Sequence, residues 1–183
     1  IQHINSRRID IKMKNLIDAI RPTTFVGSSK LKDDLGLDVT AATETFQHTG
    51  SFKFRAAYNL ASTVPNQKIV SASSGNFGQA LAYACKLVGK QCVVVMPETS
   101  ARIKIEAVRK FGATANLVDT NRTTREDRVD ELMTEHADAY QASAFNDELV
   151  IEGNASLGDE LAGKGFDAVL VPIGGGGLIS GII

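Results

Sequence analysis

The chain has 183 residues, 43% of them hydrophobic and 22% charged, with a formal net charge of −1. This balance is typical of a globular protein and gives no reason to expect nucleic acid or an anionic membrane as a partner. No apolar run is long enough to span a bilayer, and the N-terminal stretch lacks the apolar core of a signal peptide, so we expect a cytoplasmic protein.

Hydrophobic periodicity predicts an alternation of helices and strands. The first half contains, in order, a helix at 6–20, a helix at 28–36, a strand at 38–45, a helix at 53–62, a strand at 68–73 and a helix at 76–89. The second half contains a strand at 91–97, a helix at 100–112, a strand at 114–119, a helix at 124–136, a strand at 138–143, a helix at 148–163, a strand at 167–173 and a final helix from 178. Ser100 is the expected N-cap of the helix at 100–112, and Gly112 is its expected stop.

Strands separated by helices predict an α/β fold with three αβα layers and parallel sheets. We expect residues 67–146 to form a small α/β domain, and residues 1–66 and 147–183 to be parts of a larger one. The chain stops at Ile183, a few residues into a helix, so we also expect it to be the N-terminal part of a longer protein.

The cysteines and histidines show no pattern typical of a redox or metal-binding site. Cys85 and Cys92 form no CxxC motif and are expected to be two buried thiols. His3, His48 and His136 are scattered without ligand spacing, so we expect no metal site. The candidate site must therefore come from other motifs.

The glycine run in PIGGGGLISG follows an expected buried strand and precedes a helix. Backbone N–H groups without side chains around them can approach an anion closely, which favours a phosphate site. The dinucleotide pattern G-x-G-x-x-G does not fit, because Ile179 takes the place of the third glycine. The stretch GDELAGK (158–164) is followed by Gly165 where a nucleotide triphosphate site needs Ser or Thr, so we exclude that site as well.

Two further motifs carry polar groups in unusual positions. In SASSGNFGQALAY, serines, a glycine and an asparagine surround an expected helix start, an arrangement that suits a carboxylate or simply caps a helix well. In HTGSFKFRAAYNL, Lys53 stands between Phe52 and Phe54 just after a glycine turn. An ordinary surface lysine has polar neighbours, so this amine calls for another explanation.

TGSFKFRAA, SSGNFGQA and PIGGGGLISG, in this order and at these spacings, resemble the fold type II family of pyridoxal-phosphate enzymes, the tryptophan synthase β-like group. Within that family the chain is most similar to threonine/serine dehydratases and serine racemase. The resemblance covers nearly the whole sequence. It implies the cofactor pyridoxal 5'-phosphate, a small amino acid as substrate, and a homodimer for the full-length protein.

The resemblance also implies roles for single residues. Lys53 is the lysine that bonds covalently to the cofactor, Phe52 packs against the cofactor ring, and Asn76 donates a hydrogen bond to its phenolic oxygen. The phosphate is expected at the glycine run Gly174, Gly175, Gly176 and Gly177. The substrate carboxylate is expected in a pocket lined by Ser73, Ser74, Gly75, Asn76 and Phe77. In racemase-like members the second serine, here Ser74, is the catalytic acid/base opposite the lysine, while Phe54 is expected in the core.

The apolar residues around Lys53 suit a lysine that bonds covalently to an aldehyde cofactor. An amine must be neutral to attack an aldehyde, and apolar neighbours lower its pKa by disfavouring the ammonium form. The leading hypothesis is a lyase that converts a β-hydroxy amino acid such as threonine or serine into a 2-keto acid and ammonia. The alternatives are a serine-type racemase, a β-replacement enzyme, or an inactive fragment or regulatory module.

The sequence departs from the family pattern at four places. Ala56 stands where relatives have glycine, Ala42 where they have lysine, and Phe77 where many have histidine. The partner of the pyridine nitrogen, and any metal ligands, are expected beyond Ile183.

Overall fold

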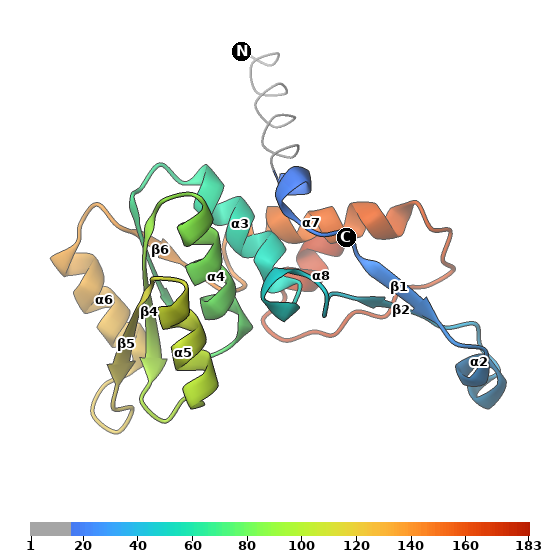
Figure 1. Cartoon of the computed structure of the whole chain (residues 1–183), viewed down its shortest axis with the longest axis horizontal. Helices are drawn as coiled ribbons and strands as arrows, with labels where there is room; N and C mark the ends of the chain where they lie inside the picture. Colours follow the sequence, from blue (N-terminus) through green and yellow to red (C-terminus); the bar gives the residue numbers. More distant parts are fainter. Residues whose placement is uncertain (1–15) are drawn as a thin grey trace, which may run out of the picture.

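The computed structural model of the chain describes residues 16–183, and these form two β-sheets with helices packed around them (Figure 1). The larger sheet has four parallel strands in the order β5-β4-β3-β6. The smaller sheet is an antiparallel pair of β1 (Thr24–Gly27) and β2 (Thr40–Thr43). The predicted α/β class with a parallel sheet is therefore confirmed.

The four-stranded sheet is built from short apolar runs that are buried on both faces, as parallel strands require. Its strands are β3 (Lys68–Ala72), β4 (Gln91–Pro97), β5 (Thr114–Val118) and β6 (Tyr140–Ala142). Because side chains alternate along a strand, Ile69 and Val94 face one side of the sheet while Val70 and Val95 face the other. The strands thus divide the core into two apolar layers.

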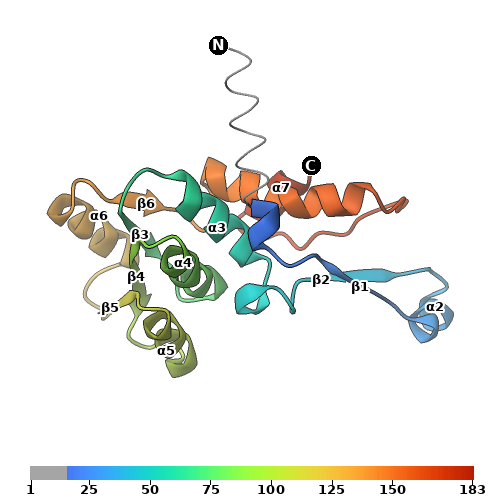
Figure 2. The same cartoon turned by 45° about the horizontal axis from the view of Figure 1, so that its top comes forward.

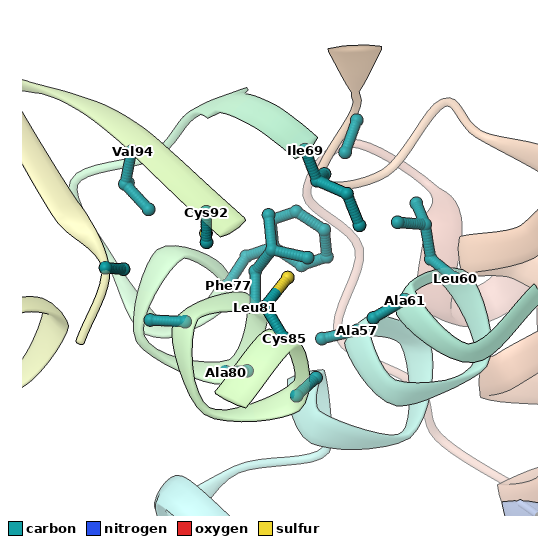
Figure 3. Packing of buried hydrophobic residues seen from close by; sticks show 14 of the residues in the cluster. Ala57, Leu60, Ala61, Ile69, Phe77, Ala80, Leu81, Cys85, Cys92 and Val94 are labelled. Carbon is teal, nitrogen blue, oxygen red and sulfur yellow. The ribbon is translucent and has the colours of Figure 1, made fainter. Parts of the chain in front are cut away.

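Helices cover both faces of this sheet. One face packs against α4 (Asn76–Leu87) and α5 (Arg102–Lys110), and the other against α6 (Arg125–Glu135) (Figure 1). Figure 3 shows the first of these layers, where Phe77, Leu81 and Cys85 of α4 lie among apolar side chains of the strands and of α3. Both cysteines are buried and free, as predicted, and a hydrogen bond with Cys85, together with burial, raises the pKa of Cys92 well above its ordinary value.

The order of strands reverses once, and this reversal positions the candidate site. The chain moves outward from β3 to β4 and β5, then returns through α6 to place β6 on the other side of β3. In parallel sheets, a crevice opens at such a switch point, outside the carboxyl ends of the two strands. The segments that leave β3 and β6 therefore meet at this edge.

Three further helices pack in series next to α4: α3 (Lys53–Thr63) and α7 (Glu148–Ala162), which lie side by side in Figure 2, and α8 (Gly177–Ile182), labelled in Figure 1. Glycines allow them to pack closely. A Cβ atom on Gly153 of α7 would lie 2.7 Å from Ala56 Cα of α3, and one on Gly181 of α8 would lie 2.6 Å from Ile151 O of α7. Larger residues at these positions would push the helices apart.

Arg55 of α3 is fully buried, a feature that the sequence did not indicate. Its guanidinium pairs with Glu44 at 2.7 Å and Glu160 at 2.8 Å and also donates to Thr23 and Ser156. A buried charge needs such partners. This network ties the β1–β2 ribbon to α3 and α7.

The β1–β2 ribbon extends away from the rest of the chain, with α2 (Ser29–Leu35) between its strands and the short 3-10 helix η1 (His48–Gly50) after it (Figure 1). The prediction for α2 is confirmed, since Ser28 caps its start and Gly36, with φ +67°, ends it. Strand β1 was not predicted. It is only four residues long and exists through its pairing with β2.

Two local predictions are wrong. Residues 167–173 form no strand, and Leu170 and Ile173 are 97% and 71% exposed. An apolar run becomes a strand only when a neighbour supplies hydrogen bonds, and no described strand pairs with this one. Ser100 is not the N-cap of α5. Ala101 takes that position without a side-chain hydrogen bond, while the Ser100 hydroxyl is buried without a partner.

Gly112 ends α5 with φ +84°, as predicted. Most of the predicted helix at 6–20 lies outside the described residues, although 16–19 are helical. The division into domains stays a prediction, but the strands of the larger sheet all fall within 67–146. No helix within residues 16–183 has the length and apolarity needed to cross a membrane.

Candidate active site

Lys53, the first residue of α3, reaches the edge of the four-stranded sheet at the switch point. Its Nζ atom donates a hydrogen bond of 2.9 Å to the carbonyl of Ala144, two residues beyond the end of β6. The side chain is half-buried, and loss of water around it lowers the pKa of the Lys53 ammonium below its ordinary value. Burial therefore increases the fraction of neutral, nucleophilic amine at a given pH.

Two aromatic rings flank this amine. Lys53 Nζ lies 4.9 Å from the centroid of Phe52 and 6.0 Å from that of Phe77. Phe77 is only 2% exposed and belongs to the core layer of Figure 3, so its ring forms a rigid wall. Phe54 lies on the other side of the helix start and is fully buried, which confirms its predicted core position.

The serine loop, Ser73–Asn76, connects β3 to α4. Ser73 is buried, and its hydroxyl accepts hydrogen bonds from the N–H groups of Gly78 at 2.9 Å and Gly75 at 3.4 Å. This hydroxyl holds the loop in shape and is turned toward the loop's own backbone. Ser74 and Asn76, in contrast, are exposed at the carboxyl edge of β3.

Asn76 has a partner that sequence reasoning missed. Lys104 of α5 donates a hydrogen bond of 2.6 Å from Nζ to Asn76 Oδ1. The residues are 28 positions apart, and nothing in either motif connects them. Their meeting depends on α4 and α5 lying side by side on one face of the sheet.

The glycine loop, Gly174–Gly177, packs against the segment that follows β6. A Cβ on Gly175 would lie 2.4 Å from the Phe145 ring, and one on Gly177 would lie 2.7 Å from the Phe145 carbonyl oxygen. Gly176 has φ +88°, which an L side chain rarely adopts. Buried Asn154 of α7 fixes the loop from the other side by donating to the Gly177 carbonyl at 2.9 Å.

The segment after β6 brings the lysine and the glycine loop together. Lys53 bonds to Ala144, while the next residue, Phe145, supports the glycine loop. Neither Ala144 nor Phe145 was predicted, because a backbone carbonyl and a lone phenylalanine carry no sequence signal. The amine, the aromatic wall and the glycine loop thus converge at the switch point between β3 and β6.

Comparison with known proteins agrees with this arrangement. The family described as pyridoxal-phosphate dependent enzyme (PALP) matches residues 16–183. The chain belongs to this family. It is 35% identical over 177 residues to serine racemase of Mus musculus, and 35% identical over 170 residues to L-threo-3-hydroxyaspartate ammonia-lyase of Saccharomyces cerevisiae. These matches cover 92% and 88% of this chain but 52% and 51% of the relatives, so the chain spans about half their length.

Solved structures give the same result for the fold. The crystal structure of serine racemase from Dictyostelium discoideum superposes with a TM-score of 0.85 at 32% identity, covering 96% of this chain and 59% of the other. The fold is therefore that of the fold type II pyridoxal-phosphate enzymes. Their parallel sheet and helical layers are present in the described residues.

The residues present fit the family's cofactor. Lys53 offers an amine with a lowered pKa, as bonding to an aldehyde requires. The space beside Gly174 and Gly176 is open, since a Cβ on either would meet no atom within 4 Å, so the loop has room for a phosphate. Within residues 16–183, no group of three or more His, Cys, Asp or Glu side chains could hold a metal ion.

Proposed function

We propose that the protein is a pyridoxal-phosphate-dependent lyase that acts on a β-hydroxy amino acid such as serine or threonine. The substrate would lose its Cα proton and its β-hydroxyl as water, and hydrolysis of the product would return that water and release a 2-keto acid and ammonia. The half-buried Lys53 amine at the switch point carries this proposal. The bound cofactor would supply an electron sink for the charge left on Cα.

Lys53 has two roles in this proposal. It would hold the cofactor covalently, and its freed amine would accept the Cα proton at Nζ. A lowered pKa suits both roles, because the neutral amine is the form that attacks a carbonyl and takes up a proton. The rings of Phe52 and Phe77 limit the access of water to this amine.

The other predicted residues would bind the cofactor and orient the substrate. Asn76 would donate to the phenolic oxygen of the cofactor, and the glycine loop would hold the phosphate. The substrate carboxylate would lie at the serine loop, where the exposed Ser74 and the backbone of Gly75 are accessible. Ser73 would contribute through the loop shape that its hydroxyl fixes. We also expect the full-length protein to be a homodimer.

A second candidate function is amino-acid racemisation. The similarity to serine racemase, at 35% identity, favours it as much as the similarity to ammonia-lyases favours elimination. The Ser74 side chain is exposed and makes no hydrogen bond to another residue within 16–183, so it is available to return a proton on the face opposite Lys53. Incubation with L- and D-serine and threonine, scored for keto acid, ammonia and inverted amino acid, separates the two functions.

The lysine assignment is tested by covalent trapping. Reduction of the full-length protein with borohydride in the presence of pyridoxal phosphate should attach the cofactor to Lys53, as detected by peptide mass spectrometry. Lys53→Ala should abolish this label and the release of keto acid, because Lys53 is the half-buried lysine whose amine bonds to Ala144 at the switch point. If the Lys53→Ala variant were still labelled and still released keto acid, Lys53 would not be the residue that binds the cofactor.

Lys90 provides a matched control. Burial also lowers the pKa of Lys90, but its amine donates to the Val64 carbonyl near the amino-terminal edge of the sheet, where β4 begins. If a lowered pKa alone caused labelling, Lys90 would be modified too. We expect Lys90→Ala to leave the label on Lys53 unchanged.

A further inference from the structure

The Asn76 amide is already bonded within the chain through its oxygen. Lys104 Nζ lies 2.6 Å from Asn76 Oδ1, a short, charge-assisted hydrogen bond. Asn76 is the first residue of α4, and Lys104 lies in the first turn of α5, so the bond joins the starts of two neighbouring helices. The proposed function uses Asn76 but gives no role to Lys104.

The chemistry of the two groups fixes the orientation of the amide. An ammonium carries three donors and no acceptor, so only the oxygen of an asparagine can face it. With Oδ1 turned to Lys104, the Nδ2 group and its two donors point away from Lys104, on the other branch of the planar amide. The Asn76 side chain makes no other hydrogen bond within residues 16–183, which leaves Nδ2 available.

We propose that Lys104 is a positioning residue that sets the Asn76 amide so that its nitrogen faces the cofactor. This inference rests on the proposed function. The phenolic oxygen of pyridoxal phosphate accepts hydrogen bonds, so Asn76 helps only if it presents Nδ2. An exposed amide without Lys104 could turn over at little cost and present Oδ1, whose lone pairs would repel that oxygen.

A role in folding alone does not account for Lys104. It makes no ion pair with a carboxylate in the described part of the chain, so the asparagine oxygen is its polar partner. Helix α5 is anchored to the core by the apolar side chains of Ile105 and Val108. The hydrogen bond therefore uses the Lys104 ammonium to orient the Asn76 amide.

The experiment measures the affinity of the full-length apo-protein for pyridoxal phosphate by fluorescence titration. We expect Lys104→Met to weaken binding about 5-fold and Asn76→Ala about 10-fold, the size of one lost hydrogen bond. The double variant should bind no more weakly than Asn76→Ala alone, because Lys104 acts only through Asn76. Lys104→Arg, which keeps the donors, should restore most of the affinity.

The control is Lys110→Met, the same substitution in the last turn of the same helix, and it should leave the affinity unchanged. Thermal unfolding of each apo-protein detects a folding defect. If Lys104→Met does not fold, Lys104→Ala, which also removes the donor, replaces it in the comparison.

Two results would overturn the inference alone. Effects that multiply to about 50-fold in the double variant would mean that Lys104 acts independently of Asn76. Unchanged affinity in Lys104→Met, with Lys53 still labelled by borohydride, would mean that the amide needs no orientation. If Lys53 is not labelled at all, the proposed function fails, and this inference fails with it.

Discussion

The serine loop and the glycine loop occupy equivalent places in the sequence, each after an apolar run and before a helix, yet the structure holds them differently. The serine loop follows β3, which is paired on both sides by β4 and β6. The glycine loop follows residues 167–173, which form no strand and expose Leu170 and Ile173. The sheet therefore fixes the first loop, while Asn154 and Phe145 support the second.

This difference concerns how two loops that we propose to bind anions are held in place. In the serine loop, backbone amides are aligned by the sheet and by the Ser73 hydroxyl before any ligand arrives. In the glycine loop, the absence of side chains allows close approach, but the preceding chain has no ladder of hydrogen bonds to hold it. We expect Gly78→Ala, beside the serine loop, to cost folding energy, and Gly174→Ala, at the open start of the glycine loop, to cost less.

The largest expected effect comes from Gly78→Ala next to the serine loop. A Cβ there would lie 2.8 Å from Val94 Cγ1 and 3.0 Å from the Ser73 carbonyl oxygen, both in the buried layer. Overpacking should outweigh the better helix propensity of alanine and lower the free energy of unfolding by about 2 kcal/mol.

The matched substitution is Gly174→Ala, where a Cβ would meet no atom within 4 Å. Its free energy of unfolding should stay within about 0.5 kcal/mol of the original. Urea unfolding of both variants measures the difference. Equal losses would contradict the contrast between the two loops.

A smaller effect is expected from Ser73→Ala. The substitution removes the acceptor for the Gly75 and Gly78 N–H groups at the start of α4. Loss of such a cap typically costs about 1 kcal/mol, measured as a lower unfolding midpoint in urea. Ser74→Ala is the neighbouring control and should change stability by less than about 0.5 kcal/mol, since Ser74 is exposed. A larger loss for Ser74 than for Ser73 would reverse the assignment of the capping residue.

The smallest effect concerns Tyr140, which ties β6 to the start of α7. Its hydroxyl donates to Asp147 at 3.0 Å, and burial, with the Asp147 charge, raises the pKa of Tyr140 to about 12. A raised pKa means that the neutral ring stabilises the fold fully below pH 10, and that this contribution is lost as the pH rises toward 12. Because solvent screens this half-exposed ring, we expect a contribution of about 0.5 kcal/mol.

Tyr140→Phe tests this through the pH dependence of unfolding. The variant should be less stable at pH 8 and should lose less stability than the original between pH 10 and 12. If the stabilities of the variant and the original fell in parallel between pH 10 and 12, Tyr140 would not be the group whose titration lowers stability.

Several local features were predictable because neighbouring residues determine them. Ser28 and Gly36 bracket α2, Gly112 ends α5, and the run Gln91–Pro97 is a buried strand, all as the sequence indicated. One wrong prediction involves a partner distant in the sequence, because residues 167–173 have no neighbouring strand among those described. The other is local, since α5 begins at Arg102 and Ala101, not Ser100, takes the N-cap position.

The residues of the candidate site also fall into two groups, those that the sequence indicated and those that it did not. Lys53 was found from its aromatic neighbours and the glycine loop from its composition, because both signals lie within a few residues. Lys104, Ala144 and Phe145 were not found. Lys104 meets Asn76 across 28 residues, and Lys53 meets Ala144 across 91, distances over which a single sequence gives no signal.

The sequence alone therefore determined which groups the protein has: an amine among aromatic rings, a serine loop, a glycine loop and a family resemblance that the comparisons confirm. Only the tertiary structure decided which groups meet. The strand order β5-β4-β3-β6 reverses between β3 and β6 and so brings the ends of both strands to Lys53. That order follows from how helices cover the two faces of the sheet, a property of the whole core that no local motif contains.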